Sequence, residues 1–364
     1  MSKAINKVWH RWKYLLAYML PLATFNALYA QGIWTFYTLF LAFGILPLME
    51  LFYEGTTKNL DKQEEEIEKK KWLYDIMLYL NVPLQYGLLV IFLNRISLPH
   101  LTPLEVTGMT VSFGICCGVI GINVAHELGH RRKQYEIIMA KMLLATTLYM
   151  HFYIEHNRGH HKNVSTPLDP ASSRRGEMMY TFWFRSIFGA YKGAWKLEND
   201  RLRKEGKHWL SLHNEMVRFH IIQFAMCAAI FALFGGFALL AFFGSSFIGY
   251  LLLESVNYIE HYGLQRREIK PGVYEKCLPI HSWNSNHDLG RIMLYELTRH
   301  SDHHYLASRK YQVLRHFDQS PQLPTGYPGS ILLAAIPPLW FKIMNKRVDE
   351  FNNQLNRQMQ GVPA

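Results

Sequence analysis

Residues 237–261 read "FALLAFFGSSFIGYLLLESVNYIEH", a long apolar run that ends on a glutamate and a histidine. Glu254 is the only charged residue before that final pair. A helix of roughly 20 predominantly apolar residues is long enough to cross the hydrocarbon core of a bilayer. The stretch therefore predicts a membrane-spanning helix that carries a histidine out of one of its ends.

Five further apolar runs have a similar length and few charges, so the sequence predicts six transmembrane helices. The six runs cover residues 14–30, 33–53, 72–94, 105–125, 217–234 and 237–259. The fold class that they predict is an all-α integral membrane protein, with residues 1–364 in a single membrane domain.

The apolar runs have two other interpretations. A large soluble helical protein also has buried helices, but their apolar runs are usually shorter and more strictly amphipathic. The first run could also be a signal peptide, because it has a basic start. No clear small-residue cleavage site follows that run, and the second run begins almost at once, so an uncleaved span is favoured.

The loops differ in charge, and this difference predicts an orientation. Arg95 is the only Lys or Arg in residues 95–104, whereas the long polar segments are strongly basic. The positive-inside rule places both termini in the cytoplasm, together with a helical cap made of residues 127–216 and 262–364. A net charge of +11 suits anionic lipid headgroups or an acidic protein partner, and it does not require nucleic acid.

The four cysteines, Cys116, Cys117, Cys227 and Cys277, form no CxxC pair. A disulfide framework, a zinc ribbon and a rubredoxin-type iron site are therefore unsupported. Any cysteine-ligated electron carrier must be a separate chain.

Histidines gather at the cytoplasmic ends of the predicted spans. The chain has 18 histidines, and half of them fall into four short clusters. The clusters are His126 and His130 in "HELGH", His156, His160 and His161 in "EHNRGHH", His261 in "NYIEHYGL", and His300, His303 and His304 in "LTRHSDHH". In a helix, the spacing of the last three predicts that their imidazoles point the same way.

Nine clustered imidazoles indicate metal binding. Neutral imidazole is a common ligand of iron, copper and zinc, whereas many buried imidazoles without a metal would each need hydrogen-bond partners. Nine ligands suit two metals with four or five each. "HELGH" also matches the HExxH pattern of zinc proteases, with Glu127 as the base, but that chemistry would leave most of the clustered histidines unexplained. A transporter that relays protons through histidines would need polar residues near the middle of the membrane instead.

Acidic residues adjoin each cluster. Glu127, Glu155, Glu260 and Asp302 each neighbour a histidine in sequence, and Asn257 lies in the same motif as Glu260. Sequence neighbours on a helix point in different directions. We therefore expect these side chains to hold the free ring N–H of a histidine from another segment.

With these residues assembled, the chain resembles the membrane alkane monooxygenases of the AlkB type, within the superfamily of histidine-rich membrane di-iron desaturases and hydroxylases. "HELGH", "EHNRGHH", "NYIEHYGL", "HSWNSNH" and "LTRHSDHH" occur in the order of that family, between about residues 120 and 316. The pair "NYIEHYGL" and "RHSDHH" distinguishes it from ordinary fatty-acyl desaturases. Thr298, where the family often has glutamine, and "HRRK" after the first motif are small departures that remove no ligand.

The resemblance implies a di-iron centre held by all nine clustered histidines, while His281 and His287 of "HSWNSNH" are not assigned as ligands. It implies terminal hydroxylation of medium- to long-chain alkanes with O2, in a bacterial inner membrane. The electrons are expected from a separate rubredoxin, which an NAD(P)H-dependent reductase reduces. A related oxygenase that acts on aromatic methyl groups, fatty acids or terpenes is the nearest alternative, and a membrane zinc protease is a more distant one.

Two further sets of residues are expected around this centre. Phe43, Phe113 and His151 are candidates for the walls of an apolar substrate channel. The candidates for contact with an acidic electron carrier are Arg131, Arg132, Lys133, Arg174 and Arg175. The same basic residues are equally explained as charges that set the membrane topology.

Overall fold

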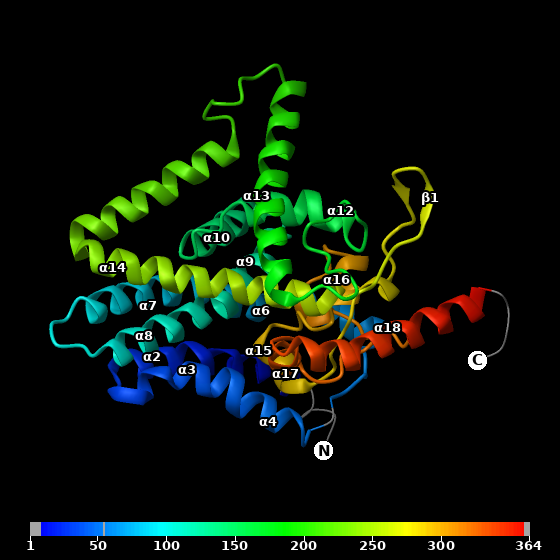
Figure 1. Ribbon diagram of the computed structural model, residues 1–364, viewed down its shortest axis with the longest axis horizontal. Helices are drawn as coiled ribbons and strands as arrows, with labels where there is room; N and C mark the ends of the chain where they lie inside the picture. The colour runs from blue at the N-terminus through cyan, green and yellow to red at the C-terminus, as the bar shows by residue number, and fades with distance from the viewer. Residues whose placement is uncertain (1–8, 54, 360–364) are drawn as a thin grey trace.

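The computed structural model describes residues 9–53 and 55–359, and this part of the chain is mostly helical (Figure 1). The chain ends, which we expect in the cytoplasm, lie outside the described residues. The helical segments up to residue 129 are η1 (Lys13–Tyr18), α2 (Met19–Tyr29), η2 (Gly32–Phe36), α3 (Tyr37–Phe40), η3 (Leu41–Ile45), α4 (Leu46–Glu50), α5 (Lys62–Glu68), α6 (Trp72–Tyr79), α7 (Asn81–Ile96), α8 (Pro103–Cys116), η4 (Cys117–Ile122) and α9 (Asn123–Gly129).

The second part of the chain adds three long helices, α13, α14 and α18, and several short ones. Its elements are α10 (Gln134–Ala145), α11 (Phe152–Glu155), η5 (His156–His160), α12 (His161–Asn163), α13 (Met179–Lys204), α14 (Glu215–His261), η6 (Pro279–His281), α15 (Asp288–Met293), α16 (His300–Tyr305), η7 (Tyr311–Val313), α17 (Tyr327–Ala334) and α18 (Pro337–Met359). The strands β1 (Glu268–Lys270) and β2 (Val273–Tyr274) form a small antiparallel hairpin.

Four helical stretches of the described chain are long and apolar enough to cross a membrane. They are Gly32–Glu50, Trp72–Ile96, Pro103–Gly129 and Glu215–His261. Three of them match predicted spans, and the fourth contains both of the last two predicted spans. The first predicted span, 14–30, forms the helical segments η1 and α2 and is not among the four.

Helix α14 is not straight. Gly235 has φ 83° and ψ 174°, which is outside the helical region, so the helix is divided into two arms. A positive φ of this kind is readily adopted only by glycine. Figure 1 shows the first arm descending from the loop after α13 to the bend, and the second arm returning along α7 and α8. The bend falls between the two predicted spans 217–234 and 237–259, where the sequence has consecutive glycines.

Glycines allow α8 and the second arm of α14 to pack backbone against backbone. A Cβ atom added to Gly114 would lie 2.7 Å from Cβ of Ile248 and 2.8 Å from the backbone oxygen of Ser245. Gly118 and Gly249 make a similar close approach one turn further along. Small residues are the usual means by which membrane helices approach closely. This contact anchors α14, whose C-terminal end carries His261.

Gly114→Ala should therefore lower the free energy of unfolding by about 1–3 kcal/mol, because the added methyl group overfills the contact with α14. Thermal melting of the detergent-solubilised protein measures this effect. Gly44→Ala is the matched control, since a Cβ atom at Gly44 meets nothing within 4 Å. Equal melting temperatures for the two variants would contradict the close helix contact.

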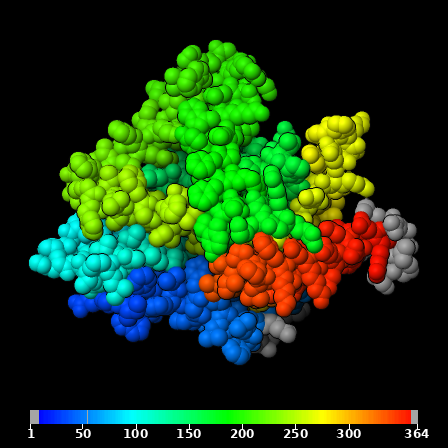
Figure 2. All heavy atoms as spheres, viewed as in Figure 1, coloured from blue at the N-terminus to red at the C-terminus, as the bar shows by residue number. Residues whose placement is uncertain are grey.

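The histidine-bearing segments lie at one end of the long helices. In Figure 1, α9, α12 and α16 gather where the second arm of α14 ends. Figure 2 shows α13, in green, standing against the orange and red C-terminal helices on the same face. The hydroxyl group of Tyr180 on α13 donates a hydrogen bond to the backbone oxygen of Ala335, which follows α17. The fold thus brings four separate histidine clusters to one end of a helical body.

Candidate metal centre

All nine clustered histidines meet in two compact groups. The five-histidine group consists of His126, His130, His156, His161 and His303, and the four-histidine group consists of His160, His261, His300 and His304. Within each group, one ring nitrogen of every member lies within 4.8 Å of those of the others. Seven of the nine side chains are buried, whereas His130 and His161 are partly exposed.

A π-helical turn divides the second histidine cluster between the two groups. In η5 the backbone N–H of His161 donates to the oxygen of His156, which is five residues earlier. A π turn of this kind is rare and is frequent at functional sites. It brings His161 next to His156, with the two rings edge to face, and their Nε2 atoms lie 3.0 Å apart in the five-histidine group. His160 then points into the four-histidine group, although it is adjacent to His161 in the sequence.

Helix α16 also supplies both groups. His300 and His304 are one turn apart, and their Nε2 atoms are separated by 2.8 Å. His303 instead places its Nε2 atom 3.1 Å from that of His161, in the other group. The three imidazoles are neighbours, but the angular difference between positions i+3 and i+4 divides them between the two groups.

The distances between ring nitrogens fit metal ions. Two nitrogens bound at right angles to a metal, each at about 2.1 Å, lie about 3 Å apart. Nε2 of His156 is 3.1 Å from Nε2 of His130, and Nε2 of His300 is 3.3 Å from Nε2 of His261. The buried Nε2 atom of His126 has no hydrogen-bond partner in the described structure.

Asp169 fixes one of these imidazoles in the form that can bind a metal. Its Oδ2 atom lies 2.9 Å from Nδ1 of His160 and also accepts a hydrogen bond from the hydroxyl group of Ser172, at 2.6 Å. A carboxylate only accepts hydrogen bonds, so Nδ1 of His160 carries the proton. The lone pair of its Nε2 atom then faces Nε2 of His304 at 3.2 Å, an arrangement that a bound cation would stabilise.

Burial keeps most of the imidazoles neutral. It lowers the pKa of His130 to about 3, and it lowers the pKa values of His156, His161, His300, His303 and His304. Neighbouring histidines add to this effect, because a second positive charge nearby is unfavourable. Neutral imidazole is the ligand form, so the environment prepares these side chains for a metal.

A cavity adjoins both groups. His126 and His156 of the five-histidine group line it together with His300 of the four-histidine group. Most of its remaining wall is apolar and comes from η4 and the second arm of α14, including Val119, Leu252, Leu253 and Val256. Asn257 and Glu260 are polar residues of the same wall. The cavity has the character of a site for an apolar molecule held next to the histidines.

Of the supporting residues that the sequence suggested, Glu260 lies closest to the histidines. Its Oε2 atom is 3.1 Å from Nε2 of His300, and its Oε1 atom accepts a hydrogen bond from the hydroxyl group of Tyr327 at 2.6 Å. Glu260 is adjacent to His261 in the sequence, but the histidine that it contacts, His300, belongs to another segment. The carboxylate of Glu260 faces Nε2 of His300, which points into the four-histidine group. The sequence instead predicts contact with the opposite ring nitrogen, Nδ1.

The other suggested supports have different contacts. Glu127 pairs with Arg131 at 2.6 Å, and Asn257 donates to Glu254 at 3.2 Å. Oδ2 of Asp302 accepts a hydrogen bond from the backbone N–H of Arg315 at 2.7 Å. Glu155 is buried, and its Oε1 atom would lie 2.6 Å from a Cβ atom added at position 159, so its carboxylate occupies the space beside Gly159.

Asp169 was missed by the sequence reasoning, which considered only acids directly beside a histidine. It lies eight residues after His161, in the polar stretch "STPLDP". Its position after the second histidine cluster is a weak signal, because nothing in the sequence shows that the loop turns back onto His160. Tyr327 was missed for the same reason.

The candidate channel residues do not line this cavity. Phe113 is buried in α8, where its ring stacks on that of Phe92 at 4.7 Å. Phe43 is partly buried in η3. His151 is buried beside Tyr149, with ring centroids 4.3 Å apart, and immediately precedes Phe152, which lines the cavity.

The candidate docking residues fall into two kinds. Arg131 is almost buried and binds both Glu127 and Asp75, the latter at 3.3 Å. The remaining candidates, Arg132, Lys133, Arg174 and Arg175, are exposed. Arg175 forms a surface ion pair with Asp349 at 2.7 Å.

The two histidines of "HSWNSNH", His281 and His287, are members of neither group. The buried Nδ1 atom of His281 accepts the backbone N–H of Leu278, and Nδ1 of His287 lies 2.9 Å from the hydroxyl group of Ser285.

The geometry defines a class: a helical protein with apolar helices of membrane-spanning length and a buried, two-part histidine centre suited to metal ions. A model of the fatty acid desaturase family matches residues 102–328, which include every member of both groups. The chain belongs to this family and, within it, to the alkane 1-monooxygenases, so the resemblance seen in the motifs is confirmed.

Two alkane 1-monooxygenases illustrate the relationship. The chain is 39% identical to alkane 1-monooxygenase 1 of Alcanivorax borkumensis, over 95% of this chain and 86% of that protein. It is 41% identical to the alkane 1-monooxygenase of Ectopseudomonas oleovorans, over 90% and 81% of the two chains. It is also 32% identical to the xylene/toluene monooxygenase hydroxylase component of Pseudomonas putida, over 75% and 73% of the two chains.

Proposed function

We propose that this protein is an alkane 1-monooxygenase, which converts a medium- to long-chain alkane, O2, two electrons and two protons to a primary alcohol and water. The observation that carries the proposal is the contact between both histidine groups and one apolar cavity. The full-length similarity to alkane 1-monooxygenases supports the substrate class.

The nine histidines are proposed as the ligands of two iron ions, five at one and four at the other. Bound iron would supply the activation of O2 that an unactivated C–H bond requires and that no side chain provides. Zinc in a protease would use Glu127 as a free general base. Here Glu127 is engaged by Arg131 and by the backbone N–H of Tyr311, which favours the oxygenase.

The side chains of the cavity would bind and orient the alkane. Leu252, Leu253 and Val256 offer an apolar wall on α14, and Asn257 and Glu260 mark its polar end beside His300. The terminal carbon would lie at that end, with the rest of the chain along the helices. Phe43, Phe113 and His151 are proposed for outer parts of the path from the bilayer, and Glu155 and Asp302 for support of the surrounding backbone.

The proposed setting is the bacterial inner membrane, with the whole chain as one domain. The two arms of α14 serve as separate spans, and Lys13–Tyr29 serves as the first of six. The histidine end, the cap formed by residues 127–216 and 262–364, and both termini are placed in the cytoplasm. An alkane partitions into the bilayer, so a site at the inner ends of the spans can receive it without passage through water.

The proposed electron donor is a separate rubredoxin, reduced by an NAD(P)H-dependent reductase. His130 and His161 are the partly exposed members of the five-histidine group, which makes this group the more accessible to a carrier. Arg132, Lys133, Arg174 and Arg175 are exposed cations for an acidic protein. Arg131 would act indirectly, through its buried pair with Glu127.

Changing Arg132 and Lys133 to glutamate should lower the carrier-dependent kcat/KM by about tenfold at low ionic strength, because charge complementarity speeds association. Added salt should shrink the difference. Stopped-flow reduction by rubredoxin measures this effect, and Arg203→Glu on the exposed side of α13 is the control. If glutamate at positions 132 and 133 leaves reduction by rubredoxin unchanged, rubredoxin docks on another surface of the protein.

Product analysis tests the proposed function. Purified protein with iron, rubredoxin, its reductase and NAD(P)H should form 1-octanol from octane and 1-hexadecanol from hexadecane. Toluene and xylene serve as the second substrate class, because the xylene/toluene monooxygenase component matches three quarters of the chain. Preferential oxidation of the aromatic methyl group, or zinc in place of iron, would overturn the proposal.

A further inference from the structure

Helix α16 is a short element with an unusual task. It has six residues, yet it gives His303 to the five-histidine group and His300 and His304 to the four-histidine group. A shift of this helix therefore changes both groups at once. Its own hydrogen bonds are few, and they begin at the backbone oxygen of Arg299, which accepts from the N–H groups of Asp302 and His303.

The turn that leads into α16 has a conformation that its residues disfavour. Tyr295 has φ 51° and Glu296 has φ 60°, in the left-handed region that side chains other than glycine rarely adopt. Two such residues in succession persist only where the surroundings hold them. The hydroxyl group of Tyr295 accepts a hydrogen bond from Asn81 at 3.0 Å, so one of the two is tied to the start of α7.

The carboxylate of the other residue, Glu296, has four side-chain partners. Oε1 accepts from Nζ of Lys13 at 2.6 Å and from the hydroxyl group of Tyr14 at 2.9 Å. Oε2 accepts from Nε of Arg291 at 2.8 Å, and Nε of Arg299 lies 3.8 Å away. We call Glu296 and these four partners the Glu296 clamp. It joins the N-terminal helix to the last histidine motif across more than half of the sequence.

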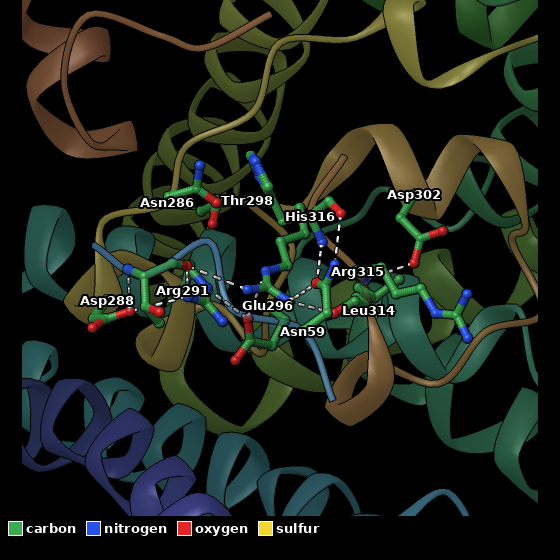
Figure 3. Close-up of polar contacts among 12 residues, drawn as sticks. Asn59, Asn286, Asp288, Arg291, Glu296, Thr298, Asp302, Leu314, Arg315 and His316 are labelled. Atoms are coloured by element: carbon green, nitrogen blue, oxygen red, sulfur yellow. Dashed lines mark hydrogen bonds and ion pairs between the residues drawn. The ribbon is translucent and has the colours of Figure 1, made fainter. Parts of the chain in front are cut away.

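Arg299 extends the clamp to two further segments. Its guanidinium group donates to the backbone oxygen of Leu314 at 2.7 Å and to that of Lys58 at 3.2 Å. Asn59 accepts the backbone N–H of His316 at 2.7 Å and thereby ties the same two segments together (Figure 3). Residues 56–59 have no regular secondary structure, so these bonds define where they lie.

The electrostatics of the clamp make Glu296 indispensable to it. Lys13, Arg291 and Arg299 are all buried, and Glu296 is only 2% exposed. Burial alone raises the pKa of this carboxyl, but the surrounding cations hold it well below its usual range. Without this carboxylate the buried cations would repel each other, and a buried charge that loses its partner is strongly unfavourable. Figure 3 shows Arg291 and Glu296 as neighbours, with Asp302 further away.

We propose that Glu296 is a positioning residue of the metal centre: its clamp holds α16 in the register that keeps the ligands of both histidine groups together. The inference rests on the proposed two-iron function. It assigns a role in that function to residues of the N-terminal helix, although Lys13 and Tyr14 lie far from the histidines in sequence.

Tyr14→Phe tests the clamp with the smallest change, because it removes one hydrogen bond to Glu296 and keeps the ring. Tyr74→Phe is the matched control, since Tyr74 is a fully buried neighbour whose hydroxyl group binds Glu68 instead. Lys13→Met and Glu296→Gln are larger perturbations of the clamp, and Lys13→Arg keeps the charge. The readouts are the rate of iron release to a chelator and the Mössbauer spectrum of both irons.

Tyr14→Phe and Lys13→Met should release iron several-fold faster than the parent, and Glu296→Gln at least about tenfold faster, in the range seen for residues that support metal ligands. Both iron signals should change, while Tyr74→Phe and Lys13→Arg should match the parent. If Glu296→Gln does not fold, the two milder variants decide.

Parental release rates and spectra in Tyr14→Phe and Lys13→Met would overturn the proposal, as would equal changes in Tyr74→Phe or a change in only one iron signal. Absence of iron from the parent protein would instead refute the proposed function, so the two failures are distinguishable.

Discussion

His303→Ala and His304→Ala should each remove one iron, and the two variants should lose different irons. The residues are adjacent on α16, but His303 belongs to the five-histidine group and His304 to the four-histidine group. Iron content should fall from two to about one per chain, because each group loses a ligand that the remaining imidazoles cannot replace. Alkane hydroxylation should fall by more than about 100-fold. This loss is larger than the one expected when a residue that only supports a metal ligand is changed.

Mössbauer spectra of the two variants measure this effect together with iron analysis and alcohol formation. His281→Ala is the control, because His281 is equally buried but lies outside both groups. Loss of the same iron signal in both variants would contradict the division of the histidines. Parental iron and activity in His303→Ala would refute its role as a ligand.

Asp169→Asn should weaken iron binding in the four-histidine group by about 10- to 100-fold. The carboxylate accepts from Nδ1 of His160, from the hydroxyl group of Ser172 and from the backbone N–H of Ala171. An amide has only one oxygen, so its NH2 group must face one of these donors. If it faces His160, that ring adopts the other tautomer, and the proton on its Nε2 atom blocks the metal.

Competition with a chelator, followed at the iron of the four-histidine group, measures the change. Ser172→Ala is the matched variant, because it removes a neighbour of Asp169 but leaves the carboxylate on His160, and we expect a much smaller effect. An Asp169→Asn variant that retains iron as firmly as the parent would show that Asp169 does not support His160.

The apolar pattern predicted most of the helical body correctly. Runs 33–53, 72–94 and 105–125 each match a helix of spanning length, and the bend at Gly235 separates the last two runs into the two arms of α14. These features are local, because the length of an apolar run and the conformation of a glycine depend on neighbouring residues. The short helices of the cap were not predicted individually, since their positions depend on contacts with distant segments.

The chemistry of the site was also predictable in kind. Four motifs identified the nine histidines, because imidazoles concentrated at helix ends have few uses other than metal binding. The supporting residues were predicted less well. Asp302 was expected at a histidine and instead binds the backbone of Arg315, while Asp169 was missed. A carboxylate finds its partner through the tertiary fold, and sequence adjacency does not reveal that partner.

The sequence by itself determined that this is a helical, apolar protein with nine clustered histidines and a place among the alkane 1-monooxygenases, because hydropathy and motif order are properties of the linear chain. Only the tertiary structure decided that the neighbours His160 and His161 belong to different groups and that a lysine of the first helix secures the last histidine motif. The physical reason is the same in both cases. Metal ligation depends on ligand atoms about 2.1 Å from the ion and buried charge pairing on contacts of about 3 Å, and the three-dimensional packing of the helices sets those distances.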